Sequence, residues 1–366
     1  MKSRIDAFSS TYAIAREKFV TQADRLGLEV VSFENPERGP AGERLLTDVV
    51  CQGPPDAPMV LLANSATHGV EGFCGSAALV DWLCAEPELP PGVRVVLVHA
   101  INPYGFAWLR RVTEDNVDLN RNFVDHDSGR PENLDYVLLH DDVVPSEPPA
   151  LDAEVVNALF GRFAKDGDYF AVQSALSRGQ YSHAEGVFYG GQRAGWSNVT
   201  FQAILARFVE GAAHIAFLDF HTGLGPYGHA ELISKCLPDA PEFHRLTQWY
   251  GPAIKTSAAG ESTSPMLSGL IATAVRNIAP ADAVSAITVE YGTYPLMEIM
   301  HAVLVDNWLY QRGDPTSDYG ERVTALIKER FYPDDDDWRE LVVVRAHQLM
   351  LRAARGLATM PAPARG

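Results

Sequence analysis

Hydrophobic and polar positions along the chain switch repeatedly between a helical and a strand period. Residues 7–26 predict a helix, and the next two segments, LEVVSFE (28–34) and RLLTDVVCQG (44–53), predict strands near a sheet edge. A strand, a helix and a strand follow in MVLLANS (59–65), GSAALVDWLCAE (75–86) and VRVVLVHAINP (93–103). This order is typical of a βαβ unit.

The same alternation continues through the second half of the chain. Three further strands are expected in HIAFLDFHTG (214–223), HAELISK (229–235) and DAVSAITVEYGTY (282–294). Helices are expected between these strands and after them, through 323–331 and 338–357. The pattern favours a layered α/β fold with a mostly parallel central sheet. In such sheets ligands bind at the carboxyl ends of the strands.

No internal repeat and no linker rich in Gly or Ser divides the chain, so we expect one domain over residues 1–366. The segment at about 125–202 is rich in turn residues and aromatic residues, and it is interpreted as a long excursion from the sheet. Such excursions often carry binding residues. We therefore expect it to rim the site, with the aromatic side chains Tyr181, His183, Tyr189 and Trp196.

Composition and charge narrow the classes of function. The 366 residues are 46% hydrophobic and 10% aromatic, as in a folded protein with a large core. The formal net charge of -17 disfavours nucleic acid as a partner. The N-terminus lacks the pattern of a signal peptide, and no apolar run is long enough for a membrane span. We expect a cytoplasmic protein that acts on a small molecule and has no membrane partner.

A candidate metal site follows the strand 59–65. The segment ATHGVEGFCG (66–75) places His68 and Glu71 at that strand end, and FLDFHTG supplies His221 at the end of another strand. Imidazole and carboxylate both bind zinc, and a catalytic zinc typically takes three protein ligands and leaves one position open. The three residues form a candidate His2Glu set. The patterns HExxH and GxSxG, which would indicate other hydrolases, are absent from the sequence.

Two more stretches carry candidate chemistry. The segment NPYGFAWLRRVTEDNVDLNRNF (102–123) crowds a carboxylate, amides and a guanidinium between Asp118 and Phe123. Arginine binds carboxylates with a planar fork, which suits recognition of an acidic substrate end. The segment ITVEYGTYP places Glu290 at a strand terminus where alternation predicts burial. A buried carboxylate is costly unless it is paired, protonated or used in chemistry.

In these four motifs, HGVEG, NPYGFAWLRRVTEDNVDLNRNF, FLDFHTGLG and VEYGTYP, the sequence resembles the M14-like zinc carboxypeptidase clan, which includes succinylglutamate desuccinylase and aspartoacylase. The motifs span residues 64–295 in the family's order, and the strongest likeness is to a bacterial branch of DUF2817 type. The resemblance implies a three-layer α/β/α sandwich of the phosphorylase/hydrolase-like kind around a mixed, mostly parallel sheet. It also implies one zinc ion per chain.

The resemblance also implies a role for each matching residue. It assigns zinc to His68, Glu71 and His221, and it places Asp118 behind His68 as its carboxylate partner. Asn120 and Arg121 match the clamp for the free carboxylate of the substrate, and Glu290 matches the general base. Arg111 matches the arginine that polarises the scissile carbonyl, with the adjacent Arg110 as the alternative.

The implied function is a carboxypeptidase-like, zinc-dependent hydrolysis of an amide bond next to a carboxylate, in a small peptide or an N-acyl amino acid. An N-acyl-amino-acid deacylase and a non-catalytic binding protein on the same fold are the alternatives. Two departures bear on this choice. No tyrosine, including Tyr291 and Tyr294, matches the family's mobile tyrosine, and residues 315–358 read as helical where the desuccinylase and aspartoacylase enzymes carry a β-rich domain. The GxGxxG match at residues 223–228 leads into an expected strand, so it does not predict a dinucleotide site.

Overall fold

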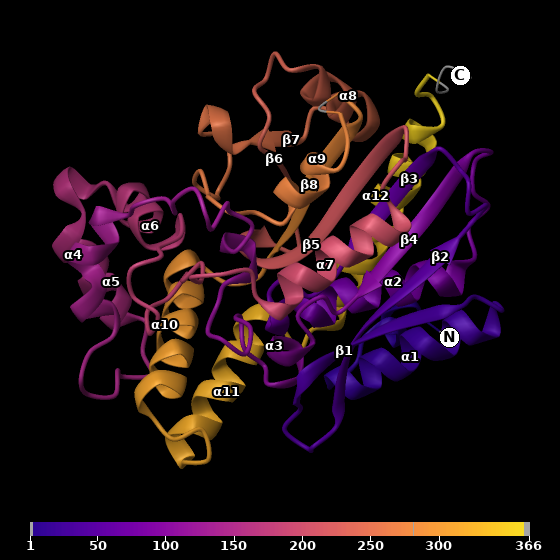
Figure 1. The fold of residues 1–366 in the computed structure, drawn as a ribbon. Coiled ribbons are helices and arrows are strands. Elements are labelled where there is room, and N and C mark those ends of the chain that lie inside the picture. The colour runs from indigo at the N-terminus through magenta and orange to yellow at the C-terminus, as the bar shows by residue number, and fades with distance from the viewer. Residues whose placement is uncertain (1–2, 281, 362–366) are drawn as a thin grey trace.

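The computed structural model describes residues 3–280 and 282–361, and its centre is an eight-stranded sheet with the order β1-β2-β4-β3-β5-β8-β6-β7 (Figure 1). The strands are β1 (Val30–Arg38), β2 (Arg44–Gln52), β3 (Met59–Asn64), β4 (Val93–His99), β5 (His214–Tyr227), β6 (Ala230–Ser234), β7 (Ile254–Thr256) and β8 (Val284–Gly292). Four pairings are parallel and three are antiparallel. The expected mixed, mostly parallel sheet is confirmed.

Helices cover both faces of this sheet (Figure 1). One face carries α1 (Tyr12–Arg25), α2 (Gly72–Ala85), α8 (Pro241–Tyr250) and α12 (Asp336–Leu357), and the other carries α7 (Trp196–Phe208) and α9 (Ala272–Asn277). Alternate strand residues pack on opposite sides: Leu61 and Leu218 lie in the first cluster, and Val60 and Phe217 lie in the second. Because both faces are buried, the central strands are almost continuously apolar. The expected three-layer α/β/α fold is confirmed.

The expected helix over 7–26 is divided in two. A short 3-10 helix covers Arg4–Ala7, and α1 begins only at Tyr12. The side chain of Thr11 accepts a hydrogen bond from the backbone N–H of Ile14, which caps the first turn of α1. The cap therefore starts the helix later than the apolar pattern predicts.

The segment 125–202 forms a helical region beside the sheet rather than an irregular loop. Its helices α4 (Leu134–Val143), α5 (Glu154–Phe163) and α6 (Tyr169–Ser177) lie at the left of Figure 1, next to α10 (Leu296–Arg312) and α11 (Asp318–Phe331). A separate apolar cluster joins them, with Phe160 and Leu176 on one side and Met300 and Val303 on the other. The region therefore has its own small core against α10.

Backbone contacts between two glycines bring the motifs of the site together. Gly69 opens the 3-10 helix Gly69–Glu71 and faces Gly105 in α3 (Pro103–Ala107), where a Cβ on Gly69 would lie 2.3 Å from the Gly105 Cα. The N–H of Gly69 donates to the carbonyl of Arg111, and the N–H of Val70 donates to that of Arg110. This close packing has no room for a side chain at Gly69. The two hydrogen bonds hold Arg110 and Arg111 next to the 3-10 helix that contains Glu71.

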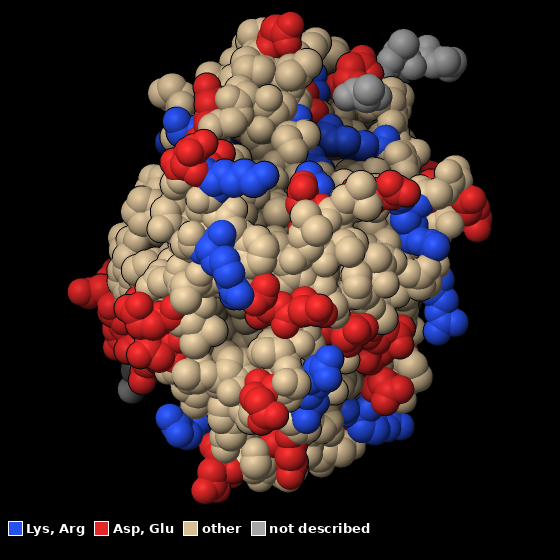
Figure 2. Space-filling model, turned by 90° about the vertical axis from the view of Figure 1, so that its left-hand side faces the viewer, with Lys and Arg blue, Asp and Glu red and all other residues tan. Residues whose placement is uncertain are grey.

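The surface shows how the net charge of -17 is distributed. Figure 2 looks onto the side of the α4–α6 region, where acidic side chains gather over several areas and basic side chains lie scattered among them. Of the acidic run at Asp334–Asp337, Asp335 caps α12 by accepting hydrogen bonds from the N–H groups of Asp337 and Trp338. No helix in the described ranges has both the length and the apolar character needed to cross a membrane.

Candidate metal centre

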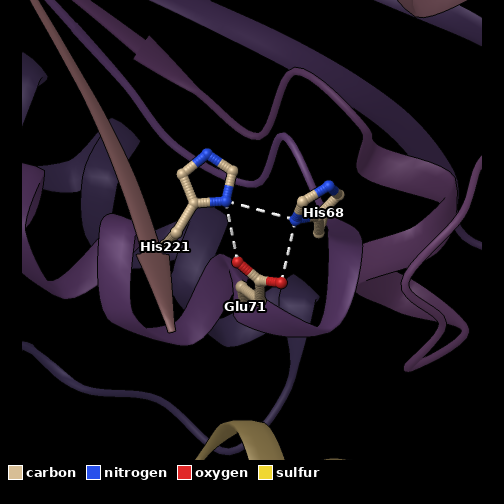
Figure 3. A group of neighbouring side chains, drawn as sticks. All are labelled: His68, Glu71 and His221. Atoms are coloured by element: carbon tan, nitrogen blue, oxygen red, sulfur yellow. Dashed lines mark hydrogen bonds and ion pairs between the residues drawn. The ribbon is translucent and has the colours of Figure 1, made fainter. Parts of the chain in front are cut away.

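His68, Glu71 and His221 converge at the carboxyl end of β3, where the parallel pairing of β3 with β5 stops at Asn64 and Asp219 (Figure 3). His68 follows β3, Glu71 ends the 3-10 helix that comes next, and His221 lies in β5. His68 Nδ1 lies 2.9 Å from Glu71 Oε1, His221 Nδ1 lies 2.9 Å from Glu71 Oε2, and the two Nδ1 atoms are 3.1 Å apart. All three side chains are buried. The structure thus brings together the set expected from sequence.

The spacing of these atoms fits a small metal ion. Ligand atoms at about 2.05 Å from a tetrahedral zinc ion would lie about 3.3 Å from one another. The three distances in the site are only slightly shorter than that. The potential ligand atoms of the set lie within 4.8 Å of one another. A modest separation of the side chains would therefore admit the ion.

A carboxylate lies behind each imidazole. His68 Nε2 is 3.1 Å from Asp118 Oδ1, and His221 Nε2 is 2.6 Å from Asp219 Oδ2. Carboxylates only accept hydrogen bonds, so each favours the tautomer with the hydrogen on Nε2. Both Nδ1 lone pairs then point at Glu71, which brings three acceptors together. A proton on His221 or a metal ion can fill the place where these acceptors meet.

The charges around the set keep its carboxylates ionised and favour a proton on His221, which a metal ion would have to displace. Burial opposes the ionisation of Glu71, but His68 and His221 outweigh it and hold the pKa of the Glu71 carboxyl below its usual value. Burial likewise opposes the ionisation of Asp118, and Arg121, His68 and Arg111 hold its pKa well below the usual value. Burial would lower the pKa of His221, but Asp219 and Glu71 raise it well above the ordinary range. The carboxylates of Glu71 and Asp118 are therefore ionised near neutral pH.

The two adjacent arginines have different places. Arg111 lines the cavity, and its guanidinium donates to Glu71 Oε1 at 2.9 Å and to Asp118 Oδ2 at 3.2 Å. Arg110 instead donates to Asn116 Oδ1, stacks on the Tyr310 ring and lies 3.5 Å from Asp306. Of the two arginines left open by the sequence, Arg111 is the one at the site.

Glu290 lies beside the metal set on the neighbouring strand. In the parallel pairing of β5 with β8 it is the register partner of His221, and its Oε1 accepts a hydrogen bond from the Leu224 N–H at 3.0 Å. Burial and the nearby Glu71 carboxylate raise the pKa of Glu290 to about 7. Tyr291 points to the opposite face, where its hydroxyl donates to the Val342 carbonyl. Glu290 is thus suited to exchange a proton near neutral pH.

The expected clamp residues line the same cavity as the metal set. The Asn120 side-chain oxygen accepts from the Ile271 N–H, so its NH2 group is the end that it can offer. Arg121 Nε and Nη2 both donate to the Ser177 carbonyl, and Nη1 donates to the Asn120 carbonyl. Each of its terminal nitrogens therefore keeps one further N–H. Arg121 can bind an anion without giving up these contacts.

The cavity has a volume of about 100 Å³. The residues of 125–202 that line it are Gln173, Ser177 and Phe188. The aromatic side chains expected to rim it have other places: Tyr181 donates to the Arg121 carbonyl, and His183 stacks on His140. None of the four expected aromatic residues, Tyr181, His183, Tyr189 and Trp196, is among the residues that line the cavity.

Two functional candidates were missed by the sequence reasoning. Asp219 lies two residues before His221 in β5, and strand alternation alone would place both side chains on one face. Lys235 follows β6 and lines the cavity, but nothing in the local sequence HAELISK distinguishes it from a surface lysine. Asp219 could be found from strand periodicity, whereas Lys235 could be found only once the fold was known.

Comparisons with known proteins give a family and several similar folds. The family model described as protein of unknown function DUF2817 matches residues 8–345, and no curated protein matches the sequence. The structure is similar to bovine thrombin-activatable fibrinolysis inhibitor in complex with tick carboxypeptidase inhibitor, at 11% identity and a TM-score of 0.46, over 96% of this chain and 99% of that chain.

Two bacterial structures are similar over a smaller share of the chain. A succinylglutamate desuccinylase from Silicibacter sp. TM1040 matches at 15% identity and a TM-score of 0.39, over 76% of this chain and 64% of that one. The murein-tripeptide amidase of Escherichia coli O157 matches at 15% identity and a TM-score of 0.36, over 79% and 93%.

Proposed function

The chain belongs to the family described as protein of unknown function DUF2817, and we propose that it is a zinc-dependent hydrolase of amide bonds next to a carboxylate. One observation carries this proposal: a single cavity contains the chemistry that the reaction needs. Its lining includes a three-residue metal set, a carboxyl group with a pKa near 7 and two arginines, namely His68, Glu71, His221, Glu290, Arg111 and Arg121.

Zinc would be held by the Nδ1 atoms of His68 and His221 and by the Glu71 carboxylate. A zinc ion at such a site polarises carbonyl groups and lowers the pKa of water. The donor set supports this assignment, because the carboxylates of Asp118 and Asp219 face the Nε2 atoms and both Nδ1 atoms face Glu71.

The contact between Arg111 and His68 depends on the tautomer of the imidazole. Its Nη2 lies 2.9 Å from His68 Nε2, which can accept that hydrogen bond only when the imidazole hydrogen is on Nδ1. A ligand role for Nδ1 requires the other tautomer, in which Nε2–H donates to Asp118. Arg111 then loses this acceptor and can donate to the substrate carbonyl oxygen, where negative charge develops.

Glu290 would act as general base and then as general acid. Its raised pKa means that a substantial fraction of the carboxylate can accept a proton from water at neutral pH and later return it to the leaving amine. The Leu224 N–H holds one carboxyl oxygen, so the other is free to face the cavity.

Arg121 and Asn120 would bind the free carboxylate of the substrate. Because that group lies beside the cleaved bond, the products would include an amino acid with a free carboxylate. The cavity of about 100 Å³ is below the range of roughly 300–1,000 Å³ found for drug-sized ligands. A terminal residue or an N-acyl amino acid is therefore favoured over a long peptide segment. Carboxypeptidase and deacylase activities share this chemistry.

A hydrolysis screen tests the proposal. Zinc-loaded protein would be incubated with short peptides and N-acyl amino acids, each with a free or an amidated carboxylate, and released amines would be quantified. We expect release from free-carboxylate substrates, loss of turnover with a chelator and recovery with added zinc. Peptides and N-acyl compounds together separate the carboxypeptidase from the deacylase. No turnover in either class would favour the non-catalytic binding protein.

A further inference from the structure

Lys235 is a basic side chain at the cavity that the proposed chemistry does not use. It follows β6, lines the cavity with Arg121, and its Nζ donates to the Leu267 carbonyl at 2.6 Å. The ionised groups that act on it are both positive, Arg121 and Arg276. Within the described ranges, no carboxylate forms an ion pair with it. A largely buried lysine in this position is costly unless an anion accompanies it.

The short segment 267–271 ties Lys235 to the carboxylate clamp. Its first residue, Leu267, accepts the hydrogen bond from Lys235, and its last, Ile271, donates to the Asn120 side chain. Between them, Gly269 accepts from the Phe123 N–H, and a Cβ on Gly269 would lie 2.2 Å from the Arg121 carbonyl oxygen. Both cations therefore belong to one wall of the cavity, and one tightly packed segment fixes their relative positions.

The negative charge nearby does not neutralise this wall. Asp118 lies 3.7 Å from Arg121 Nη1, but it also contacts Arg111 and His68. Burial, together with the charges of Arg121 and Arg276, lowers the pKa of Lys235 to about 8. The ammonium form of Lys235 is still the main form at pH 7, so this wall of the cavity has a net positive charge.

We propose that Arg121 and Lys235 together bind two carboxylates of one substrate residue, so that the amino acid released by the enzyme has an acidic side chain of the aspartate or glutamate type. This inference rests on the proposed amide hydrolysis. Arg121 takes the α-carboxylate with its two free N–H groups. Lys235 takes the side-chain carboxylate, and its remaining N–H groups supply the hydrogen bonds. The lining of the same cavity also includes Ser257 and Ser264, whose hydroxyls can donate hydrogen bonds to a carboxylate.

Calorimetric titration of the zinc-loaded protein with L-glutamate, L-glutamine, L-aspartate and L-asparagine tests the site without turnover. The acid and amide of each pair have nearly the same shape, so their difference isolates the second charge. We expect each acid to bind about tenfold or more tightly than its amide, as for a charge-assisted hydrogen bond. Lys235→Met should remove this preference, and Lys235→Arg should keep it.

Lys255→Met is the matched control, because Lys255 is exposed on β7 and pairs in register with Ile233 of β6. It should keep the preference for the acids. Equal binding of acids and amides by the wild type, or an unchanged preference in Lys235→Met, would overturn the inference. If Lys235→Met weakens acids and amides equally, the two cations share one carboxylate and the inference is also wrong.

The outcomes separate this inference from the proposed function. Hydrolysis without any preference for acidic residues would remove only the two-carboxylate site. A clear preference for acids in binding, in a protein that hydrolyses none of the peptides or N-acyl amino acids, would remove only the proposed hydrolysis.

Discussion

The two ends of the cavity differ in the groups that hold their functional side chains. At the metal end, formed by His68, Glu71 and His221, the imidazoles are held by the carboxylates Asp118 and Asp219. At the anion end, formed by Asn120, Arg121 and Lys235, the charged groups donate to the backbone carbonyls of Ser177, Asn120 and Leu267.

This difference underlies the ligand that we propose for each end. Carboxylates behind the imidazoles leave acceptors facing inward, which suits a cation. Neutral carbonyls orient the basic side chains without neutralising their charge, which suits an anion. Asp118 joins the two ends, because its Oδ1 lies 3.1 Å from His68 Nε2 and 3.7 Å from Arg121 Nη1. A substrate with a carboxylate beside its amide matches this polarity.

Removing a ligand should break the metal end completely. We expect about one zinc per chain in the wild type and almost none in His68→Ala or His221→Ala, because two remaining ligands hold the ion poorly. Elemental analysis of the purified proteins gives the ratio, and turnover should disappear with the metal. The exposed His244 supplies the control variant His244→Ala. Full zinc content in both ligand variants would show that the assignment is wrong.

Glu290→Gln should separate chemistry from metal binding at the same end. Loss of a proton-transfer group should reduce kcat by about 100-fold or more, while zinc content stays at the wild-type level. Glu231→Gln is a matched control, since Glu231 is the register partner of Glu290 on β6 and bonds to Thr263 instead. Loss of zinc in Glu290→Gln would make Glu290 a ligand, and unchanged kcat would exclude it as the base.

Arg121→Ala should break the anion end while the metal end still binds zinc. We expect kcat/KM for free-carboxylate substrates to fall about tenfold or more relative to their amidated analogues, because only the former lose a charge-assisted pair. Arg121→Lys, which keeps the charge, should recover part of this selectivity. Equal losses on both substrate types would mean that Arg121 serves the fold, through its bonds to Ser177 and Asn120.

Asp219→Asn should have the smallest effect of these variants, and it should weaken the metal end without changing the anion end. The amide can no longer enforce the Nε2–H tautomer of His221, so we expect zinc affinity to fall by about 10- to 100-fold. Competition with a chelator of known affinity measures the change. Affinity for L-glutamate at the anion end should not change once zinc is saturating. A variant with wild-type zinc affinity would show that Asp219 has no role in orienting His221.

The two ends also differ in how much the sequence foretells. Strand periodicity around 59–65 and 214–223 suggested His68, Glu71 and His221 as one candidate set, because residues that follow parallel strands lie at the same edge of a sheet, and the pairing of β3 with β5 brings them together. The roles of these residues, and those of Asp118, Asn120, Arg121 and Glu290, remain predictions. The helices of 125–202 were not foreseen, because their apolar residues face α10 rather than the sheet and the turn residues between them obscure the period.

By itself, the pattern of the sequence determined the layered α/β fold with a mostly parallel sheet and the candidate metal set, because these depend on local periodicity and on residues at strand ends; the mixed character of the sheet was implied only by the family resemblance. Only the tertiary structure placed Arg111, and not its chain neighbour Arg110, at the cavity, because the two side chains contact different partners. It also brought Lys235 to the same wall as Arg121 through the segment 267–271. Such long-range contacts depend on how loops pack across the sheet, and no local pattern of residues encodes that packing.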